Sequence, residues 1–170
     1  FYTHTIGARI GGEFPQIAAG LDWNLEVAYQ FGDINTTAAT DQVEGLAVEF
    51  EVGITFDSDY NFRLFLRFLY AEGQDDDDTG YVPLFTERHA QAGSGGTTNY
   101  RARYGLLDVI PMDNVITGQV GATFDPAKDW TVGLTVLYAE HDEDVTVGAG
   151  QDDEIGFEID LFAEYRYSDQ

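Results

Sequence analysis

Residues Leu21 to Phe31 read Leu-Asp-Trp-Asn-Leu-Glu-Val-Ala-Tyr-Gln-Phe, with a large apolar side chain at every odd position and a polar or small one at every even position. Such alternation predicts a β-strand with one apolar and one polar face. About 11 residues at roughly 3.3 Å each, tilted by about 45°, cross the hydrocarbon layer of a bilayer, whereas strands of soluble proteins usually have about five or six. The length of the stretch therefore favours a membrane-spanning strand.

The same alternation recurs along the chain and predicts six further strands. They are expected at Tyr2–Gly11, Leu46–Phe56, Phe62–Ala71, Val115–Phe124, Trp130–Tyr138 and Ile155–Tyr167. The connections at 57–61 and 125–129 are short and consist of turn-forming residues. Those at 32–44, 74–114 and 141–154 are longer and hold most of the acidic residues. Short turns on one side and long loops on the other predict an all-β fold, a transmembrane antiparallel up-and-down β-barrel.

The number of predicted strands indicates a piece of a larger barrel. Two crossings, beginning at Phe62 and Val115, separate the two short turns, so a further crossing within 74–114 would break the up-and-down order. We expect about seven or eight strands in all. The pattern itself leaves roughly seven crossings, an odd number, whereas bacterial single-chain barrels have an even number. We expect one β-barrel domain over residues 1–170, with 74–114 as a long loop that is extracellular or folded into the lumen. Since Phe1 opens a strand-like stretch and no signal peptide is visible, we expect this start to be internal to a longer chain.

The composition narrows the possible partners. The formal net charge is −23 and the isoelectric point is near 4.1, and a surface of that sign repels phosphate backbones, which argues against nucleic acid. Aromatic residues make up 14% of the chain, too many for a disordered acidic tail. No apolar run approaches about 18 residues, so a membrane-spanning helix is excluded. If the chain crosses a membrane, it does so as strands.

Aromatic residues gather at both ends of the predicted strands. Near the short turns lie Phe14, Trp23, Phe56, Phe62, Phe124, Trp130, Tyr165 and Tyr167, and near the long loops lie Tyr29, Tyr70, Tyr138 and Phe157. Amphipathic rings favour the two interfaces between lipid and water. We therefore expect these aromatic side chains to contact outer-membrane lipid and lipopolysaccharide.

The polar faces of the predicted strands carry charged residues of both signs. The candidates for lining a pore are Arg9, Glu26, Glu49, Glu51, Arg63, Arg67, Glu158, Asp160, Glu164 and Arg166. Their arginines allow two interpretations. In the first interpretation, the arginines form a ladder that guides an anionic solute, because guanidinium groups bind carboxylates in a bidentate manner. Alternatively, they pair with neighbouring acids and hold the strand register, an interpretation favoured because acids outnumber arginines and buried charges are rarely left unpaired.

Four stretches together resemble the alginate-export family of outer-membrane barrels. They are Glu26–Gly32, Tyr81–Phe85 with His89, Tyr104–Asp108 followed by Asn114, and Ile155–Leu161 ending in Tyr165. The resemblance implies a monomeric barrel with more strands than this chain supplies, before Phe1 and after Gln170. It also implies a pore, since members include a polysaccharide exporter with an arginine-rich lumen and many porin-like proteins. This chain departs from that lumen, because acids on its polar face would repel a polyuronate.

Other patterns in the chain carry weaker signals. The run Asp75, Asp76, Asp77 and Asp78 lacks the spacing of a calcium loop, so we expect a solvated acidic loop or weak binding of divalent cations. His4, His89 and His141 lack the spacing of a zinc site, and no nucleophile motif is present. Glu49 and Glu51 lie about 7 Å apart on one strand face, near the range of a glycosidase pair, but an acidic barrel holds such pairs by default. We expect no enzymatic activity, no cofactor and no resident metal.

The sequence thus predicts a bacterial outer-membrane porin or exporter-like channel that passes hydrophilic solute or polysaccharide by passive diffusion, with its long loops outside the cell. The 74–114 loop is expected to narrow the pore, with Arg101 and Arg103 as candidates for selectivity. The alternatives are a small non-conducting barrel that anchors or adheres, and a soluble barrel that binds a ligand in an apolar core. A periplasmic or multi-protein partner is left open.

Overall fold

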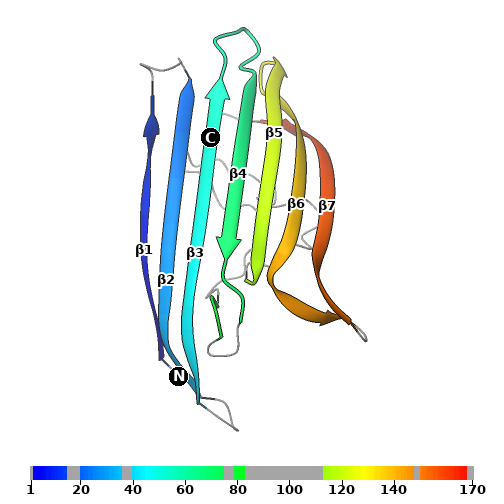
Figure 1. The fold of residues 1–170 in the computed structure, drawn as a ribbon. Helices are drawn as coiled ribbons and strands as arrows, with labels where there is room; N and C mark the ends of the chain where they lie inside the picture. The colour runs from blue at the N-terminus through cyan, green and yellow to red at the C-terminus, as the bar shows by residue number, and fades with distance from the viewer. Residues whose placement is uncertain are drawn as a thin grey trace.

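The computed structural model describes residues 2–14, 20–35, 40–74, 79–82, 113–147 and 150–167. They form seven strands: β1 (Tyr2–Glu13), β2 (Leu21–Asn35), β3 (Thr40–Thr55), β4 (Arg63–Ala71), β5 (Val115–Ala127), β6 (Trp130–Val147) and β7 (Gly150–Tyr165). Figure 1 shows them side by side in chain order in one curved sheet, with the short turns at the top. Each strand is antiparallel to the next. The predicted all-β, up-and-down fold is confirmed.

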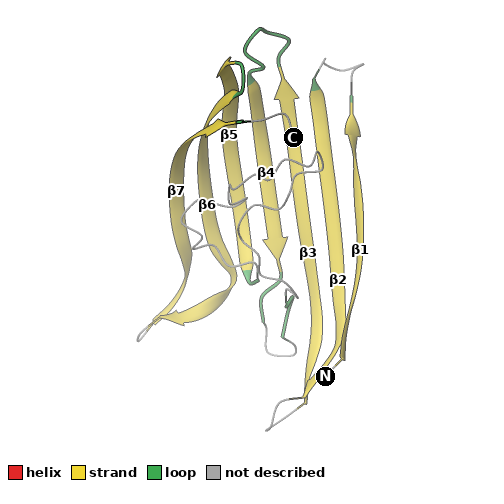
Figure 2. Ribbon diagram, turned by 180° about the vertical axis from the view of Figure 1, so that it is seen from behind, coloured by secondary structure: helices red, strands yellow, loops and turns green. Residues whose placement is uncertain are grey.

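The sheet is open within the described residues. There β1 pairs with β2 and β7 pairs with β6, but β1 and β7 do not pair with each other. Figure 2 shows the sheet from behind, coloured by secondary structure, with strands and loops but no helix among the described residues. In the part of the chain that is described, no helix has the length and hydropathy to cross a bilayer. An open, seven-stranded up-and-down sheet is consistent with a segment of a larger barrel.

The register keeps the two faces separate across all strands. Trp23 of β2 lies opposite Val52 of β3, which lies opposite Leu66 of β4. The alternate positions place Glu51 opposite Arg67. Because a shift by one residue would move every side chain to the other face, this register is strongly specified by the alternation. We call the two sides the apolar face and the polar face.

Several strands are longer than the alternation of apolar residues predicts. β2 continues to Asn35 and β3 begins at Thr40, while β6 and β7 leave only 148–149 between them. The expectation of long connections at 32–44 and 141–154 is therefore wrong. Backbone pairing in an antiparallel hairpin needs no apolar face, so the ladders extend beyond the apolar residues into acidic segments.

The turn between β5 and β6 is tighter than the predicted 125–129 connection. β5 runs on to Ala127, which pairs with Trp130, and the register shifts between Phe124 and Ala127. Pro126 lies in this irregular stretch, where its missing N–H costs no ladder hydrogen bond. Only two residues then form the turn, and Asp129 adopts a φ of 66° to close it.

Burial in this sheet is the reverse of that in a soluble protein. Large apolar side chains of the apolar face are exposed, including Ile6 at 66%, Leu66 at 58% and Leu161 at 74%. The buried cluster lies instead on the polar face, toward the long-loop end, and consists of Leu69, Ala71, Val115, Leu137 and Ala139, with Ala47, Tyr81 and Ile155 packed against it. The exposed apolar face therefore needs an apolar surrounding.

Candidate functional site: the polar face of the sheet

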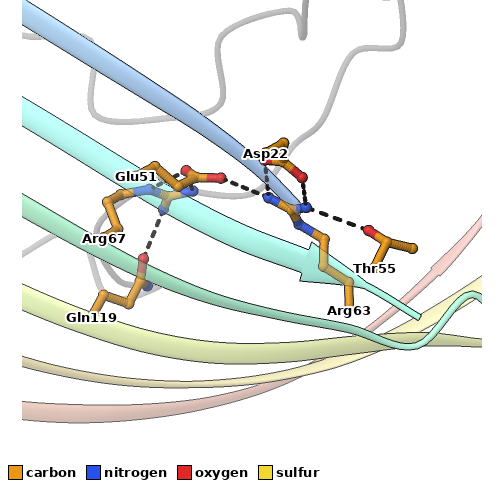
Figure 3. A network of polar contacts seen from close by, with 6 residues as sticks. All are labelled: Asp22, Glu51, Thr55, Arg63, Arg67 and Gln119. Carbon is orange, nitrogen blue, oxygen red and sulfur yellow. Dashed lines mark hydrogen bonds and ion pairs between the residues drawn. The ribbon is translucent and has the colours of Figure 1, made fainter. Parts of the chain in front are cut away.

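A network of charged residues spans β2 to β5 on the polar face, near the short-turn end (Figure 3). Arg67 donates from Nε to Glu51 at 2.8 Å and from a terminal nitrogen to Gln119 at 2.7 Å. Arg63 donates to Asp22 in a bidentate manner, with one contact at 2.9 Å, and to Glu51 at 3.2 Å. Glu51 thus joins the two guanidinium groups into one unit.

Gly53 lets the Arg63 side chain cross β3 to reach Asp22. A Cβ built on Gly53 would lie 2.2 Å from a terminal nitrogen of Arg63 and 2.4 Å from its Cζ. Any larger residue would push the guanidinium away from this path. The glycine in the middle of the β3 alternation is therefore explained by the charge network above it and not by a turn.

The partners of these two arginines limit what they can bind. The Arg63 side chain is 23% exposed and the Arg67 side chain 14% exposed, and their nearest anions are carboxylates of this chain. A bidentate contact to an incoming anion would have to displace Asp22 or Glu51. This geometry favours the role of holding strands together over that of an open anion ladder.

Arg9 is in a more open setting on β1. Its Nε donates to Asn24 at 2.8 Å and lies 4.0 Å from a carboxylate oxygen of Glu26, with both charged side chains more than half exposed. Pairing at that distance in water contributes little to stability. Arg9 and Glu26 are thus accessible charges on the polar face of β1 and β2.

The remaining predicted pore residues are distributed over the same face. Glu49 lies opposite both Glu26 and Leu69. Glu158 and Asp160 of β7 are 8% exposed each, and Asp160 accepts a long 3.4 Å hydrogen bond from the Thr135 hydroxyl. Glu164 lies opposite Thr131 on β6.

Some predicted residues lie at the margin of the described structure or outside it. Arg166 follows β7 and its backbone N–H donates to Asp129. Arg101, Arg103 and the four aspartates at 75–78 fall outside the described residues, as does most of the predicted loop at 74–114. Within the described ranges, no group of three or more His, Cys, Asp or Glu side chains could hold a metal ion.

The sequence analysis missed Gln30, which binds a segment that crosses the polar face. Its side chain is fully buried and makes two hydrogen bonds to the backbone of Val82, donating to the carbonyl at 2.6 Å and accepting from the N–H at 2.8 Å. The segment passes over β3 at Gly45, where a Cβ would lie 2.3 Å from the Tyr81 nitrogen. No sequence pattern links residues 52 positions apart, so this contact had no signal beyond a polar residue on the polar face.

Residues 79–82 form what we call the strap. Its start is fixed by backbone hydrogen bonds from Thr79 to Gln42 and from Tyr81 to Glu72, at 3.1 and 3.0 Å. Burial and then the nearby Glu26 carboxylate raise the pKa of Tyr81. The strap therefore covers the polar face next to β2 and β3, and it packs against the buried apolar cluster.

The predicted interface aromatics lie on the apolar face and pair across strands. Near the short turns, Phe56 contacts Phe62 with ring centroids 5.8 Å apart and Trp130 contacts Tyr165 at 5.0 Å. The exposed side chains at the two ends include Tyr29, Phe56, Phe62, Trp130, Tyr138, Tyr165 and Tyr167, with Phe14 stacked on Trp23. Tyr70 is half-buried and its hydroxyl donates to Asp142 at 3.2 Å.

An up-and-down antiparallel sheet with an exposed, aromatic-bordered apolar face and charges gathered on the opposite face defines a segment of an outer-membrane β-barrel. Comparison with protein-family models matches residues 2–168 to the family described as Alginate export. The chain therefore belongs to the alginate export family, a transport family whose membership implies the outer membrane of Gram-negative bacteria. A search of curated proteins found no match.

Proposed function

We propose that this chain forms part of the wall of an outer-membrane channel through which hydrophilic solute diffuses along the polar face. The observation that carries the proposal is the reversal of burial: the large apolar side chains of one face are exposed, while the buried residues and the charge network lie on the opposite face. A soluble ligand-binding barrel would bury its apolar residues, and this sheet exposes them. The alternating faces instead match those of a barrel whose lumen is wet and whose exterior meets lipid.

The charges of the polar face support a cargo other than a polyuronate. Arg63 and Arg67 bind Glu51 and Asp22, while Glu26, Glu49, Glu158, Asp160 and Glu164 add negative charge to the same face. A lumen lined by such an excess of acids attracts cations and repels anionic polymers. We infer that neutral or cationic hydrophilic solutes pass more readily than uronate oligomers.

The experiment that tests this proposal is recording in planar bilayers with the full-length protein purified from outer membranes. We expect discrete conductance steps and a reversal potential that indicates preference for potassium over chloride. Liposome swelling would then compare neutral oligosaccharides with uronate oligosaccharides of equal length, and faster entry of the neutral series is expected. Preference for chloride together with faster uronate entry would contradict the proposed cargo class.

A second candidate function is a non-conducting barrel that anchors or adheres. The observation that favours it is the buried apolar cluster around Leu69 and Leu137 on the polar face, against which Tyr81 of the strap packs. Normal membrane insertion without conductance would support this candidate over a channel.

We also propose that Arg101 and Arg103, in the connection at 74–114, contribute to the selectivity of the channel. The test is to neutralise both together: a changed ion preference in single-channel recordings is expected, and an unchanged preference would place both outside the permeation path.

A further inference from the structure

A pocket lies at the short-turn end of the sheet, between the β3–β4 turn (56–62) and the end of β5. Its volume is about 300 Å³, and it is lined by Ser58, Tyr60, Phe62, Phe124 and Pro126. Figure 1 shows the two segments next to each other at that end of the sheet. The lining surface is almost entirely apolar, which is typical of sites that bind a ligand.

Hydrogen bonds between the two segments hold the walls of the pocket in place. The Asp125 N–H donates to the Tyr60 carbonyl at 2.8 Å, and the Asn61 side-chain amide donates to the Asp125 carboxylate at 3.0 Å. Within the turn, the Asn61 N–H donates to the Ser58 carbonyl at 3.1 Å, and Asn61 adopts a φ of 46°. A site whose walls are already fixed loses little conformational entropy when it binds a partner.

The aromatic side chains of the pocket are accessible. Tyr60 is 59% exposed, and Phe62 and Phe124 are each more than a third exposed. Ser58 and Tyr60 belong to the turn and not to the ladder of paired strands. Part of the pocket wall therefore lies beyond the strand ends, where a partner in water can reach it.

The rim of the pocket is acidic. Asp57 and Asp59 are exposed and lie in the β3–β4 turn on either side of a lining residue. Asp125 already holds the walls together, so Asp57 and Asp59 are the carboxylates that face a partner. Lys128 is the only basic residue in the β3–β4 and β5–β6 turns. Such a rim attracts a cationic segment and repels the phosphates of lipid headgroups.

We propose that this pocket binds a proline-rich, basic segment of a partner protein, on the side of the membrane where the short turns lie. A polyproline II helix keeps its shape when free, and it docks on grooves lined by aromatic rings. Its prolines pack against Tyr60 and Phe124, while its arginine side chains pair with Asp57 and Asp59. The inference goes beyond the proposed function, because it assigns a protein partner and does not involve the lumen.

The test is titration of the full-length protein, in detergent micelles, into a fluorescently labelled peptide in which arginines alternate with pairs of prolines. Fluorescence anisotropy reports binding. We expect saturable binding that weakens as salt is added, since salt screens the attraction between exposed charges. A peptide with glutamate in place of arginine, and another with glycine in place of proline, should each bind about tenfold more weakly.

Variants of the protein locate the site. Tyr60→Ala removes the most exposed ring of the pocket and should weaken binding about tenfold, whereas Tyr60→Phe keeps the ring and most of the affinity. Asp57→Asn together with Asp59→Asn should weaken binding and flatten its salt dependence, and Lys128→Gln should strengthen binding. Tyr167→Ala is the matched control, since Tyr167 is 92% exposed at the same end of the sheet and does not line the pocket.

The absence of saturable peptide binding would overturn the proposal. Binding that Tyr60→Ala leaves unchanged, at an unchanged urea midpoint of unfolding, would place the peptide elsewhere and overturn it too. If Tyr60→Ala does not fold, the double aspartate variant decides, and unchanged affinity and salt dependence there would contradict the proposal. Slower insertion of Tyr60→Ala into phosphatidylethanolamine vesicles, without peptide binding by the unchanged protein, would assign the pocket to lipid. No readout uses conductance, so failure of this proposal is distinct from failure of the channel.

Discussion

Arg63 of β4 binds Asp22 of β2 across the intervening strand β3, although the two residues are 41 positions apart in the chain. Three features make this contact possible: the register that brings β2, β3 and β4 into line, the length of the arginine side chain, and Gly53 beneath it. The contact ties non-neighbouring strands together on the polar face. It also removes a guanidinium from the set of groups free to bind solute.

Gly53→Ala is expected to destabilise the barrel by about 1–2 kcal/mol, because the new methyl group displaces the Arg63 guanidinium from its carboxylates. The measurement is the urea midpoint of unfolding from lipid vesicles. Gly118→Ala is the matched control, since a Cβ at Gly118 meets no atom within 4 Å. In an Arg63→Leu background the alanine should cost little more, and an undiminished cost there would show that Arg63 is not the cause.

Glu51→Gln is expected to move ion selectivity toward anions, because it removes the carboxylate shared by Arg63 and Arg67. The measurement is the reversal potential in a potassium chloride gradient across a planar bilayer. Glu140→Gln is the control, since Glu140 lies outside the polar face and contacts Tyr138. Equal shifts in both variants would indicate a general charge effect and would remove Glu51 from the permeation path.

Gln30→Leu should loosen the strap, because it removes both hydrogen bonds to Val82 and leaves a backbone N–H and carbonyl without their partner. If the strap narrows the lumen, single-channel conductance rises. Gly45→Ala should act in the same direction, since its Cβ would lie 2.3 Å from the Tyr81 nitrogen. Unchanged conductance in both variants, with normal insertion, would show that the strap does not limit flow.

The raised pKa of Tyr81 should make the folded protein less stable at high pH. Its pKa is raised in the folded protein by burial and by Glu26, so the unfolded chain releases the phenol proton first, from its ordinary pKa near 10 upward. The free energy of unfolding should therefore fall as the pH rises above about 10. Tyr81→Phe should flatten this part of the profile in urea unfolding measured at several pH values. An identical profile in both proteins would contradict the linkage.

The proposed orientation is tested by labelling intact cells with a membrane-impermeant maleimide. Asp153→Cys lies near the long-loop end of β7 and should react, whereas Ser58→Cys and Lys128→Cys lie in the short turns and should react only after the cells are opened. The opposite pattern would place the long loops in the periplasm.

Local patterning was sufficient to predict most of the fold. The alternation from Leu21 to Phe31 lies entirely within β2, and its two faces keep their character across the sheet. Patterning was a poor guide to strand ends, because β3 and β6 extend into acidic segments where backbone pairing alone maintains the ladder. The polar-face residues could be named from alternation, but their partners could not.

The sequence by itself determined the two faces, the chain order of the strands and the aromatic residues at both strand ends, because a period of two and the placement of turns are local properties. Tertiary structure decided which charges pair and where the strap lies. Those features depend on the register between strands and on contacts such as Gln30 with Val82, 52 positions apart. Long-range contacts of this kind leave no periodic signal, and only the folded sheet brings their atoms together.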